Sequence, residues 1–378
     1  MKKVLTLSLC VVVYYLLSSF PNSDAQVLST PGVISTADEL QRLNQLTQIN
    51  DSETHRLLSH FYNSEYADVN RPYTPYAVVN IAARESTAME KQFKDDAHAA
   101  RAMAILWHIT YDDKYMLKAI EIIRGWSAKF EGFNVTKGHK RQAYLEAAWV
   151  TPVWISAADA VAMGGQNNAW TNTDKEMFKH FILKLQDYFE KAYRDNNWGA
   201  SATLAQIATA VYLNDSKLYQ QQLEKFNYYL KTLTNSDGSM NADYLSDPWH
   251  PQYTLIAMIQ VAEIAFNQGD DLYGTTFGKE TLPRLALVLE HMASLFLGER
   301  PNPDGLKKGN YKGAHNNKQG YQIAYNHYFN KRQMKREQLP LFAKLVDKWA
   351  VNETSPLFMK WDRITHDQTV TSAHEDKP

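Results

Sequence analysis

Apolar residues recur with the spacing of an α-helix along most of the chain. Positions i, i+3, i+4 and i+7, which share one helical face, are apolar in well-separated stretches: Ala100, Met103, Ala104 and Trp107; Leu204, Ile207, Ala208 and Val211; and Leu255, Met258, Ile259 and Ala262. The alternation that indicates a half-buried strand is scarce. The pattern therefore predicts helices that each bury an apolar stripe in antiparallel packing.

Short polar breaks separate these stripes. They are rich in Gly, Asn, Asp and Pro, which end helices and form turns, and they lie at residues 111–113, 164–168, 214–216, 235–238 and 268–271. The spacing predicts roughly a dozen helices joined as hairpins. No break resembles a domain linker, and no fixed-period repeat stands out. We therefore expect an all-α fold, with residues 26–364 forming a single toroid or incomplete barrel of antiparallel helical hairpins.

The two ends of the chain differ from this pattern. Two lysines follow the first methionine, an apolar run covers residues 4–17, and residues 23–25 have the small-x-small pattern of a cleavage site. These features predict a secretory signal peptide over residues 1–25. The only cysteine, Cys10, follows Leu9 and so lacks the small residue of a lipoprotein site. We expect a periplasmic or secreted protein without a membrane anchor, and a polar, disordered tail over residues 365–378.

Charge and aromatic content narrow the possible partners. The chain has 40 Lys and Arg residues against 41 Asp and Glu residues, so composition gives no reason to expect nucleic-acid binding. A polyanionic substrate would need a locally basic cleft. The 22 Tyr and 9 Trp residues suit sugar rings, although many of them can equally pack between helices. Nothing argues for association, and we expect a monomer.

A first group of candidate site residues stands at a helix start, in Asn196-Asn197-Trp198-Gly199. One Asn is enough to cap a helix, so two exceed that need, although capping remains the alternative for each. A carboxamide can also donate a hydrogen bond to a substrate carboxylate. We therefore take Asn196, Asn197 and Trp198 as candidates.

A second group lies at the start of the apolar helix that follows residue 247. His250, Gln252 and Tyr253 fall together there, in a neighbourhood that also contains Asp243 and Asp247. A single His at a helix start is often structural. Together, however, these side chains can bind and deprotonate a sugar acid.

A third group follows the longest irregular segment, residues 298–320. Tyr321, Tyr325 and Tyr328 share one helical face, and His327 adjoins that face. An aromatic core stripe is the alternative interpretation. The irregular segment itself is a candidate lid or cleft wall.

Basic candidates come from two places. His139 and Arg141 precede the helix that carries Trp149, and Arg300 lies in the irregular segment. Arginine can bind a carboxylate through two parallel hydrogen bonds.

Metal and serine-hydrolase motifs are missing from the sequence. It has no His-Glu-x-x-His, no calcium-loop spacing and no nucleophile elbow. The compact cluster of Asp95, Asp96 and His98 is explained by acids near a helix start. We expect neither a metal nor a cofactor.

Three of these segments occur in the order found in alginate-lyase-domain proteins: residues 196–199, 250–274 and 325–328. The amino-terminal half is also similar to these proteins, over residues 104–113 and 119–126. The chain thus resembles the alginate-lyase-like polysaccharide lyases over nearly its whole mature length. The resemblance implies an (α/α) toroid that cleaves a polyuronate, either alginate or glucuronan, by β-elimination.

The same resemblance implies roles for the candidate residues. In β-elimination a base removes the proton at C5 of the uronic acid while the bond to O4 breaks, and hydrogen bonds stabilise the enolate-like charge. Tyr253 matches the catalytic tyrosine, as base, acid or both, and Tyr325 is a second candidate. Asn197 and His250, with Arg141 or Arg300, would neutralise the carboxylate. Further substrate contacts would come from the remaining candidates: Asn196, Trp198, His139, Gln252 and His327.

Two positions depart from the family pattern. The better-known alginate lyases have His where this chain has Trp198, and Arg where it has Ser246. The neutralising groups must therefore be partly different.

Two other functions remain open from sequence. A hydrolase on the same helical scaffold would use the paired acids Asp243 and Asp247. A non-catalytic glycan-binding protein would need only aromatic platforms.

Overall fold

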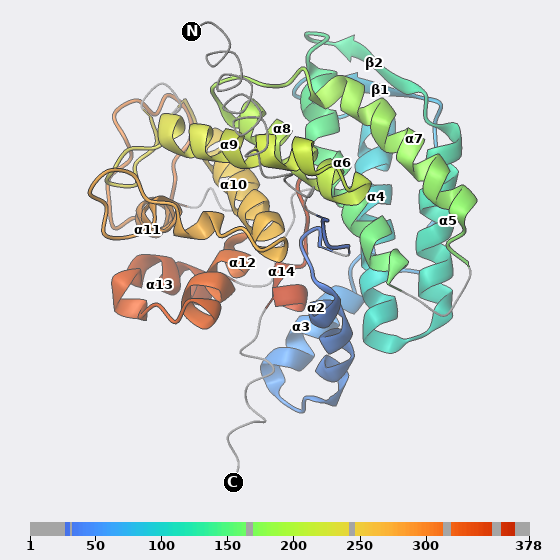
Figure 1. Ribbon diagram of the computed structural model, residues 1–378, viewed down its shortest axis with the longest axis horizontal. Coiled ribbons are helices and arrows are strands. Elements are labelled where there is room, and N and C mark those ends of the chain that lie inside the picture. Colours follow the sequence, from blue (N-terminus) through green and yellow to red (C-terminus); the bar gives the residue numbers. More distant parts are fainter. Residues whose placement is uncertain are drawn as a thin grey trace, which may run out of the picture.

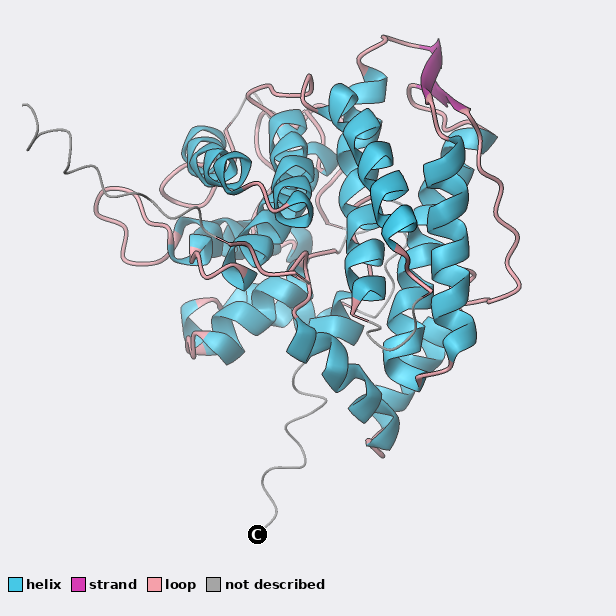
Figure 2. Cartoon of the chain, turned by 45° about the vertical axis from the view of Figure 1, so that its right-hand side comes forward, coloured by secondary structure: helices cyan, strands magenta, loops and turns pink. Residues whose placement is uncertain are grey.

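The computed structural model of the protein describes residues 27–30, 32–163, 169–241, 246–312, 319–349 and 357–366. Helices dominate these residues, and Figure 2 shows them packed side by side with one small pair of strands at the edge. The all-α prediction is therefore confirmed.

An inner layer of helices forms the centre of the fold. Each of its members contacts the next along the chain: α4 (Ala88–Thr110), α6 (Gln142–Ala162), α8 (Asn197–Leu213), α10 (Trp249–Asn267) and α12 (Tyr321–Tyr325). The helices α6, α8 and α10 are buried on nearly all sides, because both neighbouring inner helices and outer helices cover them. Their apolar residues accordingly extend beyond a single stripe.

An outer layer covers these helices. It consists of α5 (Asp113–Lys129), α7 (Asn172–Phe189), α9 (Ser216–Leu233), α11 (Arg284–Leu297) and α13 (Pro340–Lys348). The predicted turns join the layers: Tyr111 and Asn214 end α4 and α8 in the left-handed conformation, and Asp112 and Asp215 cap the helices that follow. Alternation of inner and outer helices makes the fold an (α/α) toroid, as predicted (Figure 1).

Smaller elements complete the chain. Near its start lie α2 (Ala37–Arg42), the 3₁₀ helix Leu43–Gln48 and α3 (Ser52–Tyr62), and near the described end lies α14 (Asp362–His366). Short helical turns cover Leu272–Gly274 and Arg336–Gln338, and a π-helix covers Asn326–Lys331. Strands β1 (Val78–Ala82) and β2 (Gly132–Lys137) form a parallel pair with Val78 opposite Gly132. The sequence pattern did not predict this pair.

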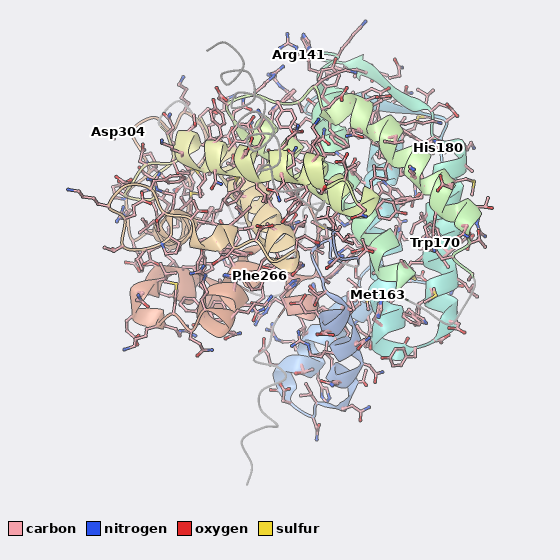
Figure 3. The ribbon with its side chains drawn as sticks, viewed as in Figure 1. Arg141, Met163, Trp170, His180, Phe266 and Asp304 are labelled. Carbon is pink, nitrogen blue, oxygen red and sulfur yellow. The ribbon has the colours of Figure 1, made fainter. Side chains whose placement is uncertain are left out.

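The inner helices α4, α6, α8 and α10 point in the same direction. The backbone N–H groups of residues 28, 29 and 32 donate hydrogen bonds to the carboxyl-terminal ends of α6, α8 and α10, at Asp159, Asn214 and Gln268. At the amino-terminal ends of α4 and α6, Lys94 Nζ lies 2.6 Å from Glu146 Oε2; at their carboxyl-terminal ends, His108 Nε2 lies 2.9 Å from the Ala160 carbonyl oxygen. In Figure 3, Arg141, just before α6, lies at the upper edge, whereas Met163, just after it, lies far below. The toroid therefore has an amino-terminal end, where the inner helices begin, and an opposite carboxyl-terminal end.

Packing in the core accounts for part of the tryptophan and phenylalanine content. Phe93, Trp126, Phe130, Trp154 and Phe181 form a continuous set of ring contacts between α4, α5, α6 and α7, with centroids 5.0–6.4 Å apart. These rings are core residues, so they are unavailable to a ligand.

The predicted tail begins too early. Thr365 and His366 belong to α14 and are buried, with His366 Nε2 bonded to the Ile34 carbonyl oxygen at 2.9 Å. The ordered chain therefore extends at least to His366. Among the described helices, none is both long and apolar enough to cross a membrane.

The start of the described chain crosses the carboxyl-terminal ends of the inner helices. One contact there, at Asp159, should make the stability of the protein depend on pH. Gly32 and Val33 donate backbone hydrogen bonds of 2.8 and 2.9 Å to Asp159 Oδ2 in α6, and burial raises the pKa of Asp159 from 3.8 to about 7. Because the folded state holds this proton more tightly than the unfolded chain does, the stability contribution of Asp159 is greatest below about pH 4. It falls as the pH rises to about 7, and is then constant.

The substitution Asp159→Asn removes this titration. Relative to the variant, the wild-type free energy of unfolding in urea should fall between about pH 4 and pH 7. A difference between the two proteins that does not change over this range would contradict the assignment.

Candidate active site

The residues that suit polyuronate chemistry gather at the amino-terminal end of the toroid. Asn197 is the first residue of α8, and His250 and Tyr253 lie in the first turns of α10. These two helices pack side by side, so residues from two separate sequence motifs lie at neighbouring helix starts. The positive end of each helix dipole also lies at these helix starts.

His250 is held by an aspartate. Its Nδ1 lies 2.7 Å from Asp247 Oδ2, while Asp247 Oδ1 accepts the backbone N–H groups of Trp249 and His250 at 2.9 and 3.1 Å. The carboxylate thus caps α10 and orients the imidazole ring. With Nδ1–H donating to Asp247, Nε2 is left to face a ligand, and the His250 side chain is 47% exposed.

Tyr253 lies beside this imidazole. The two rings are 6.0 Å apart between centroids, and the Tyr253 ring also contacts Trp149 of α6 at 5.8 Å and Phe358 at 6.2 Å. Tyr253 is half-buried, so its ring is fixed by packing while part of the side chain stays accessible. Gln252, in contrast, is fully buried within α10, which does not support its predicted contact with substrate.

The adjacent asparagines have different environments. Asn196 is the N-cap of α8, and its side chain accepts the Trp198 N–H at 2.9 Å, so the capping alternative holds for this residue. Asn197 is buried at the first helical position, and its backbone carbonyl oxygen accepts a hydrogen bond from Ser201 Oγ. Trp198 is half-buried, and the guanidinium of Arg194 lies over its ring at 4.3 Å from the centroid.

The sequence pattern does not single out Arg194, because nothing near it distinguishes it from a surface arginine. The available signal was its spacing from Trp198: the turn before α8 brings residues four apart into contact, as in a helix.

Basic residues surround this end of the toroid. His139 and Arg141 are exposed just before α6, and the His139 ring accepts the Arg141 N–H at 3.1 Å. The segment after α11 crosses the start of α10, because the N–H groups of Lys307 and Lys308 both bond to the Ser246 carbonyl oxygen at 3.1 Å. This arrangement fits the predicted cleft wall for its described part, residues 298–312.

Three predicted residues lie elsewhere. Arg300 donates to His291 Nδ1 on the outer helix α11 at 3.0 Å. The Tyr325 hydroxyl accepts a 2.6 Å hydrogen bond from Arg336, beside the outer helix α13. His327 is fully buried and stacks on Tyr273 with centroids 3.8 Å apart.

The surroundings of His327 also oppose a role in binding an anion. Burial, with a contribution from Lys331, lowers the pKa of His327 to about 3, so the ring is neutral at ordinary pH. The structure therefore does not bring Tyr325 and His327 together with His250 and Tyr253, and the core-stripe alternative describes them better.

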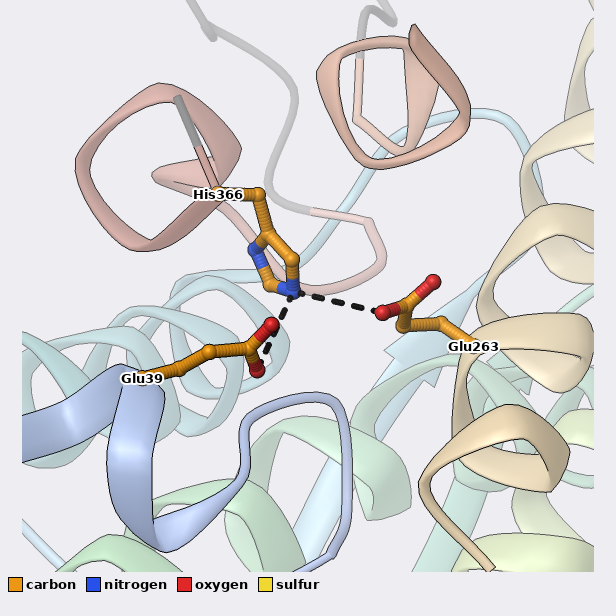
Figure 4. Close-up of side chains that lie close together, drawn as sticks. All are labelled: Glu39, Glu263 and His366. Atoms are coloured by element: carbon orange, nitrogen blue, oxygen red, sulfur yellow. Dashed lines mark ion pairs between the residues drawn. The ribbon is translucent and has the colours of Figure 1, made fainter. Parts of the chain in front are cut away.

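A second cluster of ionisable side chains lies at the opposite, carboxyl-terminal end. Glu39, Glu263 and His366 converge there, with His366 Nε2 4.0 Å from Glu39 and 3.9 Å from Glu263 (Figure 4). Lys331 Nζ lies 3.2 Å from Glu39 Oε1 and 3.0 Å from Glu263 Oε1. The His366 ring already bonds to the Ile34 carbonyl oxygen and to Thr365 Oγ1.

This arrangement has the character of a structural charge network. One ammonium pairs with both carboxylates, and both nitrogens of the imidazole are engaged. Burial raises the pKa of Glu39, but His366 and Lys331 outweigh that effect and hold the pKa below its ordinary value.

The paired-acid hypothesis is weakened by the contacts of Asp247. Its carboxylate is engaged with the start of α10 and with His250, which leaves it poorly placed to act as a free acid. Its suggested partner, Asp243, lies outside the described residues.

Solved structures of alginate lyases have the same fold. An alginate lyase from Bacteroides ovatus matches with a TM-score of 0.65 at 12% identity, covering 89% of this chain and 99% of that one. Alginate lyase A1-III from Sphingomonas species A1 matches with a TM-score of 0.62 at 13% identity, covering 91% and 99%. A variant of alginate lyase A1-III complexed with tetrasaccharide gives a TM-score of 0.65 at 13% identity, covering 92% and 98%.

At 12–13% sequence identity, the similarity to these structures shows that the chain shares their fold. A comparison with curated proteins found no similar sequence. The family model for alginate lyase matches residues 37–293, which span all of α4 to α10 and hence the residues gathered at the amino-terminal end. The match covers well over half of the chain, and the protein belongs to the alginate lyase family.

Proposed function

We propose that this protein is a periplasmic or secreted polysaccharide lyase that cleaves a polyuronate, alginate or glucuronan, by β-elimination. The observation that carries the proposal is the pairing of Tyr253 with an aspartate-held His250 at the start of α10, beside the start of α8. A half-buried phenol and an oriented imidazole next to a buried carboxamide are the groups that the reaction requires.

Each residue has a role in the proposed reaction. The substrate carboxylate lies at the starts of α8 and α10, where Asn197 and His250 stabilise the charge that develops when C5 loses its proton. His250 takes this role in its protonated form, in which Nδ1–H donates to Asp247 and Nε2–H donates to the substrate. Tyr253 removes that proton and returns one to the O4 leaving group. Because a phenol has an ordinary pKa of about 10, the base role depends on hydrogen-bond donors and positive charge near its oxygen.

The reaction leaves an unsaturated sugar, whose conjugated double bond absorbs ultraviolet light. Absorbance over time should rise when the mature protein is mixed with one of alginate, polymannuronate, polyguluronate or glucuronan. New reducing ends without new absorbance would instead favour the hydrolase, and binding without either product would favour the glycan-binding protein.

His250→Ala tests the imidazole directly. We expect kcat to fall by about 10²-fold to 10³-fold, the usual loss when a donor to a developing negative charge is removed. Asp247→Asn should give a smaller loss, since it weakens the orientation of the ring but leaves the ring present. Initial rates by ultraviolet absorbance measure both effects.

His180→Ala is the matched control for this experiment. His180 is an exposed histidine near the middle of the outer helix α7, on the right-hand side of Figure 3 and apart from Arg141. Its replacement should leave the rate unchanged. If His250→Ala behaved like His180→Ala, the imidazole would have no part in the reaction.

A further inference from the structure

Arg194 stands out among the arginines by its surroundings. Its guanidinium carbon lies 4.3 Å from the centroid of the Trp198 indole, within the range of a cation–π contact. Three other arginines also lie over an aromatic ring, and each of them is paired with a carboxylate: Arg71, Arg284 and Arg336. Among the described residues, Arg194 has no such partner, and the neighbouring Asp195 carboxylate accepts the Tyr228 hydroxyl instead.

The turn that carries Arg194 is held in place. The Asn196 N–H donates to the Arg194 carbonyl oxygen at 2.8 Å, and the Asn196 side chain caps α8. At Gly199 a Cβ atom would lie 2.2 Å from the Arg194 carbonyl oxygen and 2.3 Å from the Tyr229 hydroxyl, so only glycine allows this close approach. The positions of Arg194 and Trp198 relative to Asn197 are therefore set by the backbone.

A guanidinium that packs over an indole ring can still donate through its N–H groups, which match the two oxygens of a carboxylate. The chain also lacks the His and Arg of the better-known alginate lyases, having Trp198 and Ser246 at those positions. A cation stacked on the residue that replaces the histidine restores a positive charge at the start of α8.

We propose that Arg194, positioned by stacking on Trp198, binds the same uronate carboxylate as Asn197 and supplies the positive charge that those two replacements remove. This inference rests on the proposed elimination reaction. It adds a substrate-binding residue that acts mainly on the transition state, since neutralising the carboxylate makes the C5 proton more acidic. It also makes Trp198 a positioning residue for the guanidinium.

The kinetic test uses three variants. Arg194→Gln should lower kcat by about 10²-fold with a smaller change in KM, because the lost charge acts on the developing enolate. Arg194→Lys should recover part of that loss, since it keeps the charge without the two-pronged geometry. Arg56→Gln, at an exposed ion pair on α3, is the control and should match the wild type.

A methyl-esterified substrate shows whether Arg194 contacts the substrate carboxylate or has only a structural role. On a methyl-esterified form of the same polyuronate there is no charge to neutralise, so wild type and Arg194→Gln should differ much less than on the acid. Equal losses on acid and ester, an unchanged kcat, or a change in KM alone would overturn the proposal. Circular dichroism melting checks that the variants are folded.

Binding distinguishes failure of this inference from failure of the proposed function. If the wild type eliminates no polyuronate, the lyase proposal fails, but titration calorimetry with a uronate tetrasaccharide still tests Arg194. Weaker binding by Arg194→Gln, with a smaller dependence on salt concentration than for wild type, would support the contact. Identical affinities and salt dependence would overturn it.

Discussion

Tyr253→Phe should reduce kcat by about 10³-fold or more while the protein still binds the polyuronate. The substitution removes one oxygen, and in the proposed reaction that oxygen both takes the C5 proton and returns a proton to O4, so two proton transfers are lost together. The contacts of the ring with Trp149 and Phe358 are retained by phenylalanine, so the melting temperature should change little. Ultraviolet absorbance gives the rate, and titration calorimetry gives the affinity.

Tyr325→Phe is the matched comparison, because it removes the same atom from the other candidate tyrosine. The Tyr325 hydroxyl accepts a hydrogen bond from Arg336, so this variant should lose modest stability, about 1 kcal/mol for such a hydrogen bond, and keep its activity. A large loss of kcat in Tyr325→Phe with an active Tyr253→Phe would reverse the assignment. Loss of activity in neither variant would remove both tyrosines from the reaction.

Lys331→Met should destabilise the protein by about 3–5 kcal/mol, the usual cost of removing one partner from a buried ion pair. Lys331 serves Glu39 and Glu263 together, and both carboxylates are buried. Methionine keeps an apolar chain of similar length against Phe266, where the ammonium lies 4.9 Å from the ring centroid, so loss of packing contributes little. Urea unfolding at neutral pH measures the change in free energy.

The loss should shrink as the pH falls. Without the ammonium, burial raises the pKa of Glu39 in the folded variant relative to the wild type, so the folded variant binds a proton more readily and regains stability as the pH falls. Lys344→Met, at an exposed ion pair with Glu299, is the control and should show no measurable change. If the two variants unfolded at the same urea concentration, Lys331 would not stabilise the buried carboxylates of Glu39 and Glu263.

The charge network around Lys331 explains why the sequence pattern places the end of the ordered chain before residue 365, whereas α14 extends to His366. Residues 365 and 366 follow the pattern of a polar tail, because a threonine and a histidine near the end of a chain usually face water. Here His366 is buried because Glu39 from α2 and Glu263 from α10 surround it. Those partners lie more than a hundred residues away in sequence, and no local pattern reveals them.

The candidate site also combines motifs that are visible in the sequence with contacts that only the fold creates. The motifs at Asn197 and at His250 with Tyr253 were recognisable in the sequence, because helix starts carry a distinctive mixture of polar and apolar residues. These two motifs lie close together because α8 packs directly against α10. Tyr325 and His327 belong to an equally suggestive motif, yet a short α12 that continues as a π-helix turns them towards Arg336 and Tyr273.

The sequence by itself determined the helical hairpins and the order of their turns, because helical periodicity and capping residues act over only a few positions. It also determined the family, through motifs that keep their order along the chain. The tertiary structure alone decided which helix ends share a surface and which charged side chains are buried together. It placed Arg194 on Trp198 and Lys331 between two glutamates, since such pairings depend on the direction and spacing of helices that the periodic pattern leaves free.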